Sequence, residues 1–231
     1  MDHPIIRPHI VERVIARRGK LHWFDTLDPN RTALIIIDMQ STFCEPGSPA
    51  EVPESRSIVG PINALARELR KINIPVFWVL HANMNLGDTS DWEIFFNHVV
   101  NNDVRKQTID SLLPGKQTVW RDLETSAQDI LITKNRYSAL IPGSSTLEDQ
   151  LRIYGVDTLL IGGTKTNVCC ESTGRDAMML DYKVVMVSDC CAALSDEEHQ
   201  STLETFIQQF GDVMTASEVL QKLCWRQDRV G

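Results

Sequence analysis

The segment from Val156 to Asp189 constrains the fold of this chain more than any other stretch. Residues 158–161 (TLLI) form a short apolar run of buried-strand character, which stops at Gly162-Gly163, where the backbone turns without a Cβ penalty. Residues 183–188 (KVVMVS) return as a second buried strand after a stretch of helix-forming composition. The segment therefore predicts two parallel strands of one sheet, joined by a right-handed crossover helix.

A polar turn opens this crossover helix. Thr166 and Asn167 are its two N-cap candidates, and the helix is expected to begin at residues 168–170. Cys169 would then lie at the carboxyl end of a strand, where free N–H groups and the helix dipole lower the pKa of a thiol. Cysteine is also among the residues most often buried as packing, which is our interpretation of Cys170. The position predicts a reactive thiolate at Cys169 that faces a pocket.

Three further apolar runs predict buried strands, and a polar residue follows each of them. The runs and their following residues are 32–37 with Asp38, 74–80 with His81, and 129–133 with Lys134. Because the carboxyl ends of parallel strands share one edge of a sheet, Asp38, Lys134 and Cys169 are expected to converge there. Each of these residues also has a purely structural interpretation. Asp38 could equally form a turn, His81 could be an ordinary hydrogen-bonded histidine, and Lys134 could be a surface lysine.

The helical signals complete an alternating pattern. Residues 8–18 carry apolar side chains on one face and predict a helix within an N-terminal arm of residues 1–30. Residues 145–148 (STLE) and 215–218 (TASE) are typical of capping boxes that open helices, and residues 212–215 predict a short final strand. Six strands alternating with helices predict an α/β fold, a three-layer α/β/α sandwich with a six-stranded, mostly parallel sheet, in a single domain over residues 1–231.

Composition narrows the classes of partner. The net charge of −8 argues against nucleic-acid and anionic-membrane binding, since both require a basic face. No apolar run approaches the roughly 20 residues of a membrane span, so the expected location is cytoplasmic. The six cysteines include two vicinal pairs, a spacing that suits neither a disulfide framework nor a CxxC zinc site. We expect reduced thiols and a small-molecule substrate.

Three blocks of the sequence resemble the signature blocks of the isochorismatase-like cysteine hydrolases, and the resemblance spans about residues 31–215. The blocks are IIIDMQSTFCEPG (35–47), ITKNRYSAL (132–140) and GGTKTNVCCESTGRDAMMLDYKVVMVSDCCAA (162–193). The resemblance implies that Asp38, Lys134 and Cys169 form a catalytic triad, because the family pattern TxxC begins at Thr166 and selects Cys169. It also implies self-association, as a dimer or tetramer.

The same resemblance implies a cis peptide bond at Thr164-Lys165 and an oxyanion hole built from the N–H groups of Lys165 and Cys169. Lys165 departs from the family pattern, in which this position is usually small or apolar. Vinyl-ether-cleaving isochorismatases lack the cysteine, so the presence of Cys169 indicates hydrolysis of C–N bonds. Metal-binding nicotinamidases carry an Asp-x-His pair after the second strand, and the corresponding residues here, His81-Ala-Asn-Met-Asn, lack it. The resemblance therefore implies that the enzyme uses no metal and no other cofactor.

The expected reaction is therefore hydrolysis of a small amide by Cys169, with Asp38 as the proton acceptor and Lys134 holding charge beside the pair. Residues 134–138 (KNRYS) resemble ureidoacrylate and carbamoyl amidohydrolases, which implies a carboxamide, carbamoyl or ureido substrate. Gln40, Phe43, His81 and Tyr137 are the expected pocket-lining residues, with packing as the alternative for each. Three rival functions are a non-amide hydrolase, a nucleotide-binding module at Gly162-Gly163, and a non-catalytic relative that binds small molecules.

Overall fold

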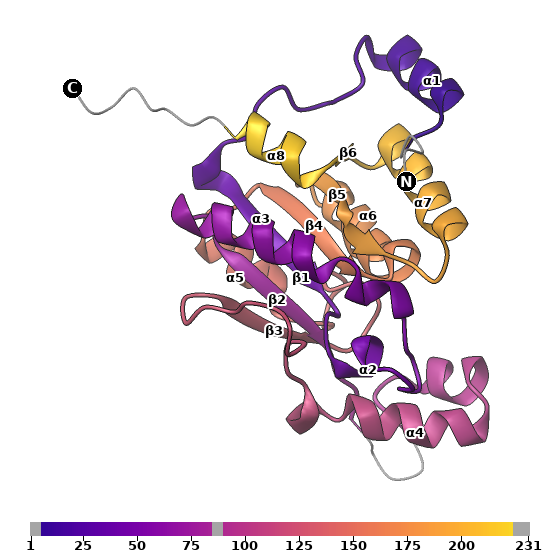
Figure 1. Cartoon of the computed structure of the whole chain (residues 1–231). Helices are drawn as coiled ribbons and strands as arrows, with labels where there is room; N and C mark the ends of the chain where they lie inside the picture. Colours follow the sequence, from indigo (N-terminus) through magenta and orange to yellow (C-terminus); the bar gives the residue numbers. More distant parts are fainter. Residues whose placement is uncertain (1–5, 85–89, 224–231) are drawn as a thin grey trace.

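The computed structural model describes residues 6–84 and 90–223, and its centre is a six-stranded sheet in the order β3-β2-β1-β4-β5-β6 (Figure 1). Every neighbouring pair of strands is parallel. The strands are β1 (Thr32–Ile37), β2 (Val76–His81), β3 (Ile130–Lys134), β4 (Thr158–Thr164), β5 (Lys183–Ala192) and β6 (Asp212–Met214). The predicted α/β fold is confirmed.

Helices cover both faces of the sheet (Figure 1). They are α1 (Pro8–Arg18), α2 (Ser41–Cys44), α3 (Val59–Lys71), α4 (Asn102–Leu112), α5 (Leu147–Ile153), α6 (Glu171–Met179), α7 (Asp196–Gln209) and α8 (Ala216–Lys222), with π-helical turns η3 (Phe95–Val99) and η5 (Thr166–Cys170). Side chains of α5, α6 and α7 pack with one set of alternating strand residues, and those of α3 and α8 with the other set. The period of two along each strand thus divides the core into two layers, one on each face.

The N-terminal helix α1 has the predicted bounds and ends at Gly19, which adopts a left-handed φ of 81°. It contacts α7, and the guanidinium of Arg7, just before α1, pairs with the buried carboxylate of Glu204 on α7. Packing of the arm onto the body is therefore seen from Ile6 onward. Residues 1–5 of the predicted arm lie outside the described residues.

Two predicted capping boxes have different outcomes. The box at Thr215 and Glu218 opens α8 as expected. The box over residues 145–148 is wrong: the hydroxyl of Ser145 accepts from the N–H of Leu147 at 3.0 Å and donates to Ala139 O at 2.7 Å. Ser145 is thus used in a turn before α5, and the helix begins at Leu147, one residue later than the box requires.

The central strands β1 and β4 approach each other closely where both end. Ile37 is in register with Gly163, which has a φ of 114°. A Cβ atom at Gly163 would lie 2.0 Å from the carbonyl oxygen of Ile37, so this position accepts only glycine.

None of the helices in the described part of the chain is long and apolar enough to cross a bilayer.

We expect Gly163→Ala to lower the free energy of unfolding by about 3 kcal/mol or more, because a methyl group would push β4 away from β1. Gly60→Ala is the matched control: Gly60 lies in α3 with open space around its Cα, and alanine favours helix by up to about 1 kcal/mol. Urea denaturation measures both variants. Equal stability of the two variants would contradict the close approach.

Candidate active site

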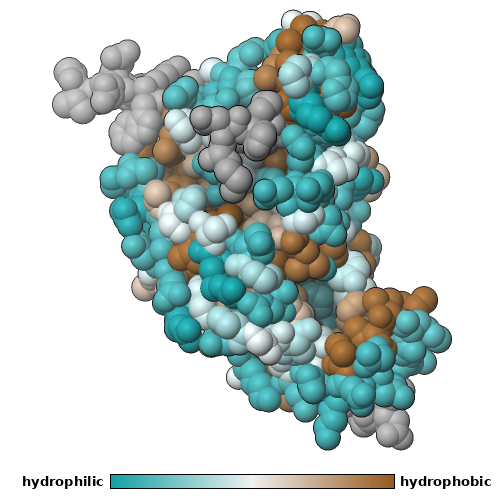
Figure 2. Space-filling view, turned by 45° about the vertical axis from the view of Figure 1, so that its right-hand side comes forward, coloured by the Kyte–Doolittle hydropathy of each residue, from teal (hydrophilic) through white to brown (hydrophobic). Residues whose placement is uncertain are grey.

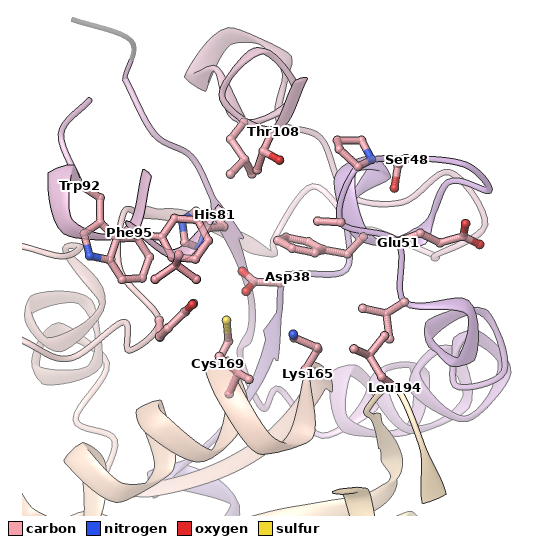
Figure 3. Close-up of a pocket in the computed structure, with 18 residues that line it drawn as sticks. Asp38, Ser48, Glu51, His81, Trp92, Phe95, Thr108, Lys165, Cys169 and Leu194 are labelled. Carbon is pink, nitrogen blue, oxygen red and sulfur yellow. The ribbon is translucent and has the colours of Figure 1, made fainter. Parts of the chain in front are cut away.

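The sheet order reverses between β1 and β4, and a cavity of about 490 Å³ lies beyond the carboxyl ends of these strands (Figure 3). Adjacent parallel strands whose connections leave in opposite directions open a crevice at this point. Eighteen residues line the cavity: Asp38, Phe43, Ser48, Pro49, Ala50, Glu51, Val52, His81, Trp92, Phe95, Val99, Thr108, Leu112, Tyr137, Lys165, Val168, Cys169 and Leu194.

An ion pair between Asp38 and Lys134 lies at the base of this cavity. Lys134 Nζ is 2.9 Å from Asp38 Oδ2, and both side chains are fully buried. The ammonium also donates to Arg136 O at 3.0 Å and lies 3.1 Å from His81 Nδ1, so all three of its hydrogens have acceptors. Burial opposes the charged form of Lys134, but Asp38 and Cys169 outweigh it and raise the pKa of the lysine above its ordinary value.

Asp38 is held in an uncommon conformation directly after β1. Its φ of 56° is left-handed, a region in which aspartate is enriched, and its N–H donates to Val79 O at 2.8 Å. Burial raises the pKa of this carboxyl group, and the contacts with Lys134 and Cys169 only partly offset that effect. Its second oxygen, Oδ1, is buried and has no hydrogen-bond partner among the described residues. Asp38 therefore combines raised basicity with an unused acceptor.

Cys169 reaches the same point from η5. One oxygen of Asp38, one ring nitrogen of His81 and the sulfur of Cys169 all lie within 4.8 Å of one another. The structure thus brings together the three residues predicted to converge, and Figure 3 shows Cys169 directed into the cavity beneath Asp38.

The start of the crossover helix differs from the prediction. The helix begins at Thr166, in a π-helical turn, and its N-cap is Lys165. Neither predicted N-cap residue caps it: the Thr166 hydroxyl lies 2.8 Å from His199 Nδ1, and Asn167 Oδ1 has no partner among the described residues. The N–H groups of Val168 and Cys170 are instead satisfied by Lys165 O. The peptide bond Thr164-Lys165 is cis, as the resemblance implied.

The expectation of a resting thiolate at Cys169 is wrong. Burial and the neighbouring negative charge of Asp38 raise the pKa of this thiol well above its ordinary value, and Lys134 offsets only part of that effect. The sequence argument counted the helix N-terminus and omitted the desolvation and the carboxylate, both of which favour the neutral thiol. Cys169 therefore holds its proton until Asp38 accepts it.

Cys170 behaves as the packing residue that we expected. Its Sγ lies 3.7 Å from Gly162 O, beneath the turn and outside the lining of the cavity. Burial and the neighbouring Cys191 raise the pKa of its thiol well above the usual range. Five cysteines in the described residues are free thiols, and Cys224 lies outside those residues.

His81 lines the cavity, but hydrogen bonds occupy both of its ring nitrogens. Nδ1 faces the Lys134 ammonium, and Nε2 lies 2.7 Å from Asn83 Oδ1, which fixes the tautomer with the proton on Nε2. Burial, followed by the charge of Lys134, lowers the pKa of this histidine well below its usual value. With these bonds in place, His81 has no lone pair for a metal ion, so the cluster of Asp38, His81 and Cys169 does not fit a metal site.

Gln40 does not line the cavity, contrary to our expectation. Its side-chain oxygen accepts from His81 N at 2.7 Å, and its nitrogen donates to His81 O at 2.9 Å and contacts Gln117. The fully buried amide therefore acts as a clamp on the end of β2. The oxygen and nitrogen of the Gln40 amide are both bonded to the backbone of His81, so neither is free to bind a ligand. Gln40 therefore positions His81.

Phe43 and Tyr137 line the cavity as expected and belong to a larger aromatic wall. The rings of Trp92 and Phe95 stack with centroids 4.9 Å apart, and Tyr137 meets Trp92 edge-on at 4.6 Å. Trp92 also stacks on His81 at 5.8 Å. Trp92 and Phe95 were not predicted as site residues.

Sequence reasoning also missed a polar network behind this wall. Asp91 accepts from the side chains of Asn83 at 2.9 Å and Asn135 at 3.0 Å. The guanidinium of Arg136 donates to Asp91 O at 2.9 Å and lies over the Trp92 ring at 5.3 Å. The network ties the segment after β2 to the segment after β3, and no local sequence pattern marks it.

Known proteins share the fold of this chain. The isochorismatase domain family matches residues 32–218, which include Asp38, Lys134 and Cys169. The structure also resembles that of a cysteine hydrolase from Pseudomonas syringae pv. phaseolicola, with a TM-score of 0.73 and 29% identity over 96% of this chain and 98% of that one. The chain therefore belongs to the isochorismatase family of hydrolases.

Two relatives show the range within this family. An uncharacterised isochorismatase family protein of Escherichia coli O157:H7 is 29% identical over 204 residues, which cover 85% of this chain and 98% of the relative. A probable inactive nicotinamidase of Arabidopsis thaliana is 31% identical over 182 residues, which cover 74% and 86% of the two chains. Family membership therefore does not by itself define the substrate.

The first prediction from the site concerns the buried ion pair. Lys134→Met should lower the free energy of unfolding by about 3–5 kcal/mol, because it leaves the Asp38 carboxylate buried without a cation. The double variant Asp38→Asn/Lys134→Met removes the charge as well and should regain most of this loss. Urea denaturation measures both. A double variant no more stable than Lys134→Met would contradict the electrostatic explanation.

The second prediction concerns the neutral thiol. Alkylation of Cys169 by iodoacetamide should keep rising with pH, by about tenfold per unit, with no plateau near neutrality. Asp38→Asn removes the negative charge that raises the thiol pKa, so at a fixed pH it should accelerate alkylation. Peptide mapping identifies the modified cysteine, and Cys170→Ala is the control. A rate that is independent of pH around neutrality would show a resting thiolate.

Proposed function

We propose that this protein is a cysteine-dependent amidohydrolase in which Asp38, Lys134 and Cys169 are the catalytic residues. The observation that carries the proposal is the cluster in which an oxygen of Asp38 lies within 4.8 Å of the Cys169 sulfur, with the pKa values of both groups raised. A carboxylate of raised basicity beside a neutral thiol is the arrangement that transfer of the thiol proton requires. Lys134 holds Oδ2 of that carboxylate in place.

The first half of the reaction forms an acyl-enzyme. Asp38 takes the proton of the Cys169 thiol as the sulfur attacks the carbonyl carbon of the amide. The N–H groups of Lys165 and Cys169 receive the oxyanion, an interaction that contributes a few kcal/mol in related chemistry. Asp38 then gives its proton to the leaving nitrogen, and the C–N bond breaks to release ammonia or an amine. The raised pKa of Asp38 suits both transfers.

The second half returns the enzyme to its starting state. Asp38, now a carboxylate again, accepts a proton from a water molecule that attacks the thioester carbonyl. The C–S bond breaks, the acid product leaves, and Cys169 recovers its proton from Asp38. Lys134 stays charged throughout, because its raised pKa keeps it an ammonium at each step. The proposed reaction uses neither metal nor other cofactor.

The proposed substrate is a small carboxamide, carbamoyl or ureido compound. The cavity of about 490 Å³ suits a molecule of that size, and its aromatic wall suits a planar group beside the scissile bond. The self-association and cytoplasmic location expected from the sequence stay predictions.

Mass spectrometry of the protein incubated with carboxamide and ureido compounds tests the proposal. We expect an acyl adduct on the peptide that holds Cys169, together with ammonia release, and Cys169→Ala should lower the rate by at least about a thousandfold. Cys170→Ala is the matched control and should keep the adduct and the activity, because its sulfur points to Gly162 O.

An adduct on another cysteine, such as the buried Cys44, would overturn the assignment. Ligand binding with no adduct and no turnover would favour a non-catalytic binding protein. One relative, from Arabidopsis thaliana, is named a probable inactive nicotinamidase. Hydrolysis of a vinyl ether that persists in Cys169→Ala would favour isochorismatase-type chemistry.

A further inference from the structure

The cavity carries one charge without a partner. Lys165 lines it beside Cys169, and Figure 3 shows the Lys165 amine directed into the open space next to the sulfur. No hydrogen bond or ion pair of this ammonium is formed with any residue in ranges 6–84 and 90–223. An ammonium that points into a cavity rather than to bulk solvent favours an anion there.

The other charged groups that line the cavity are already neutralised within the protein. Asp38 pairs with Lys134. Glu51 accepts from Arg56 at 2.8 Å and from Gly47 N at 2.7 Å, and these bonds hold the pKa of its carboxyl below its usual value. His81 is neutral for the reasons given above. The lining of the cavity therefore has one excess positive charge among the described residues, and it lies at Lys165.

The remaining lining is mostly apolar and gives the ligand its shape. In Figure 3, Trp92 and Phe95 lie on one side of Cys169, whereas Lys165 and Leu194 lie on the other. Figure 2 shows an apolar patch at its lower right, at the end of the molecule that holds η3 and α4 in Figure 1. Ile94, just before η3, and Val99, its last residue, are exposed, and Val99 belongs to the cavity lining. A ligand that spans Cys169 would meet flat apolar surface at one end and a cation at the other.

We infer that the substrate is an anionic amide: an acid whose carboxylate pairs with Lys165 while its carbamoyl, ureido or carboxamide carbonyl lies at Cys169 and its apolar body packs on Trp92 and Phe95. Lys165 is then a specificity-determining residue, in addition to any part its N–H group plays with the oxyanion. This inference rests on the proposed function for the position of the scissile carbonyl. The selection for an acid rests on charge alone.

Binding to a protein that cannot turn the ligand over separates the two proposals. The probes are N-carbamoyl-phenylglycine and 4-carbamoylbenzoate, each compared with its methyl ester, which has nearly the same shape and no charge. Titration calorimetry of Cys169→Ala should show each acid binding about 10- to 100-fold more tightly than its ester, the range for a hydrogen bond to a charged group. In Cys169→Ala/Lys165→Met, this preference should disappear.

Lys106→Met in the Cys169→Ala background is the matched control. Lys106 lies on α4, is exposed and is not part of the cavity lining, so its loss changes the net charge equally and should leave the preference intact. Lys165→Arg keeps a cation and should keep part of the preference. Raised salt should weaken the binding of the acids more than that of the esters.

The outcomes distinguish failure of this inference from failure of the proposed function. Equal binding of acid and ester, a preference that survives Lys165→Met, or no binding of either acid overturns the role of Lys165, even where neutral amides form the acyl-enzyme. A preference for the acids that Lys165→Met removes upholds that role, even where no ammonia is released. In active protein, equal losses of kcat/KM for acid and ester in Lys165→Met would assign the ammonium to the chemistry instead of to recognition.

Discussion

The site depends on the ion pair between Asp38 and Lys134, which is fully buried at the meeting point of three strands. Removing two charges from water costs several kcal/mol per ion, and only good geometry and further hydrogen bonds repay it. Here Lys134 has three acceptors: Asp38 just after β1, His81 at the end of β2 and Arg136 O just after β3. The pair therefore fixes how the ends of these strands lie relative to one another.

The same pair influences the protonation of Cys169, the proposed nucleophile. Asp38 uses one oxygen on Lys134 and leaves the other without a partner in the described structure, in a cluster shared with Cys169. A buried thiol beside a carboxylate keeps its proton, and the carboxylate beside a thiol is a stronger base than a solvated one. The proton of the resting state thus lies on the Cys169 thiol, beside the carboxylate that is proposed to accept it.

Recognition depends on a different part of the molecule. The proposed catalytic residues come from the ends of β1, β3 and β4, whereas most of the cavity wall comes from the loop before α3 and from the segments η3 and α4. Rigid strands hold the chemistry, and the connecting segments shape the space around it. Lys165 is an exception, because it belongs to the same turn as Cys169 and still faces the ligand space.

Local sequence patterns were enough to predict the sheet, the alternation of helices and the position of Asp38, Lys134 and Cys169 at one edge. These features follow from local signals, since hydrophobic runs define strands and the residue after each run lies at a carboxyl end. The three-dimensional structure was needed to show that the pKa of the Cys169 thiol is raised, that Gln40 clamps His81 and that Lys165 has no partner among the described residues. Protonation and pairing depend on desolvation and on charges from distant segments, and no local pattern encodes their sum.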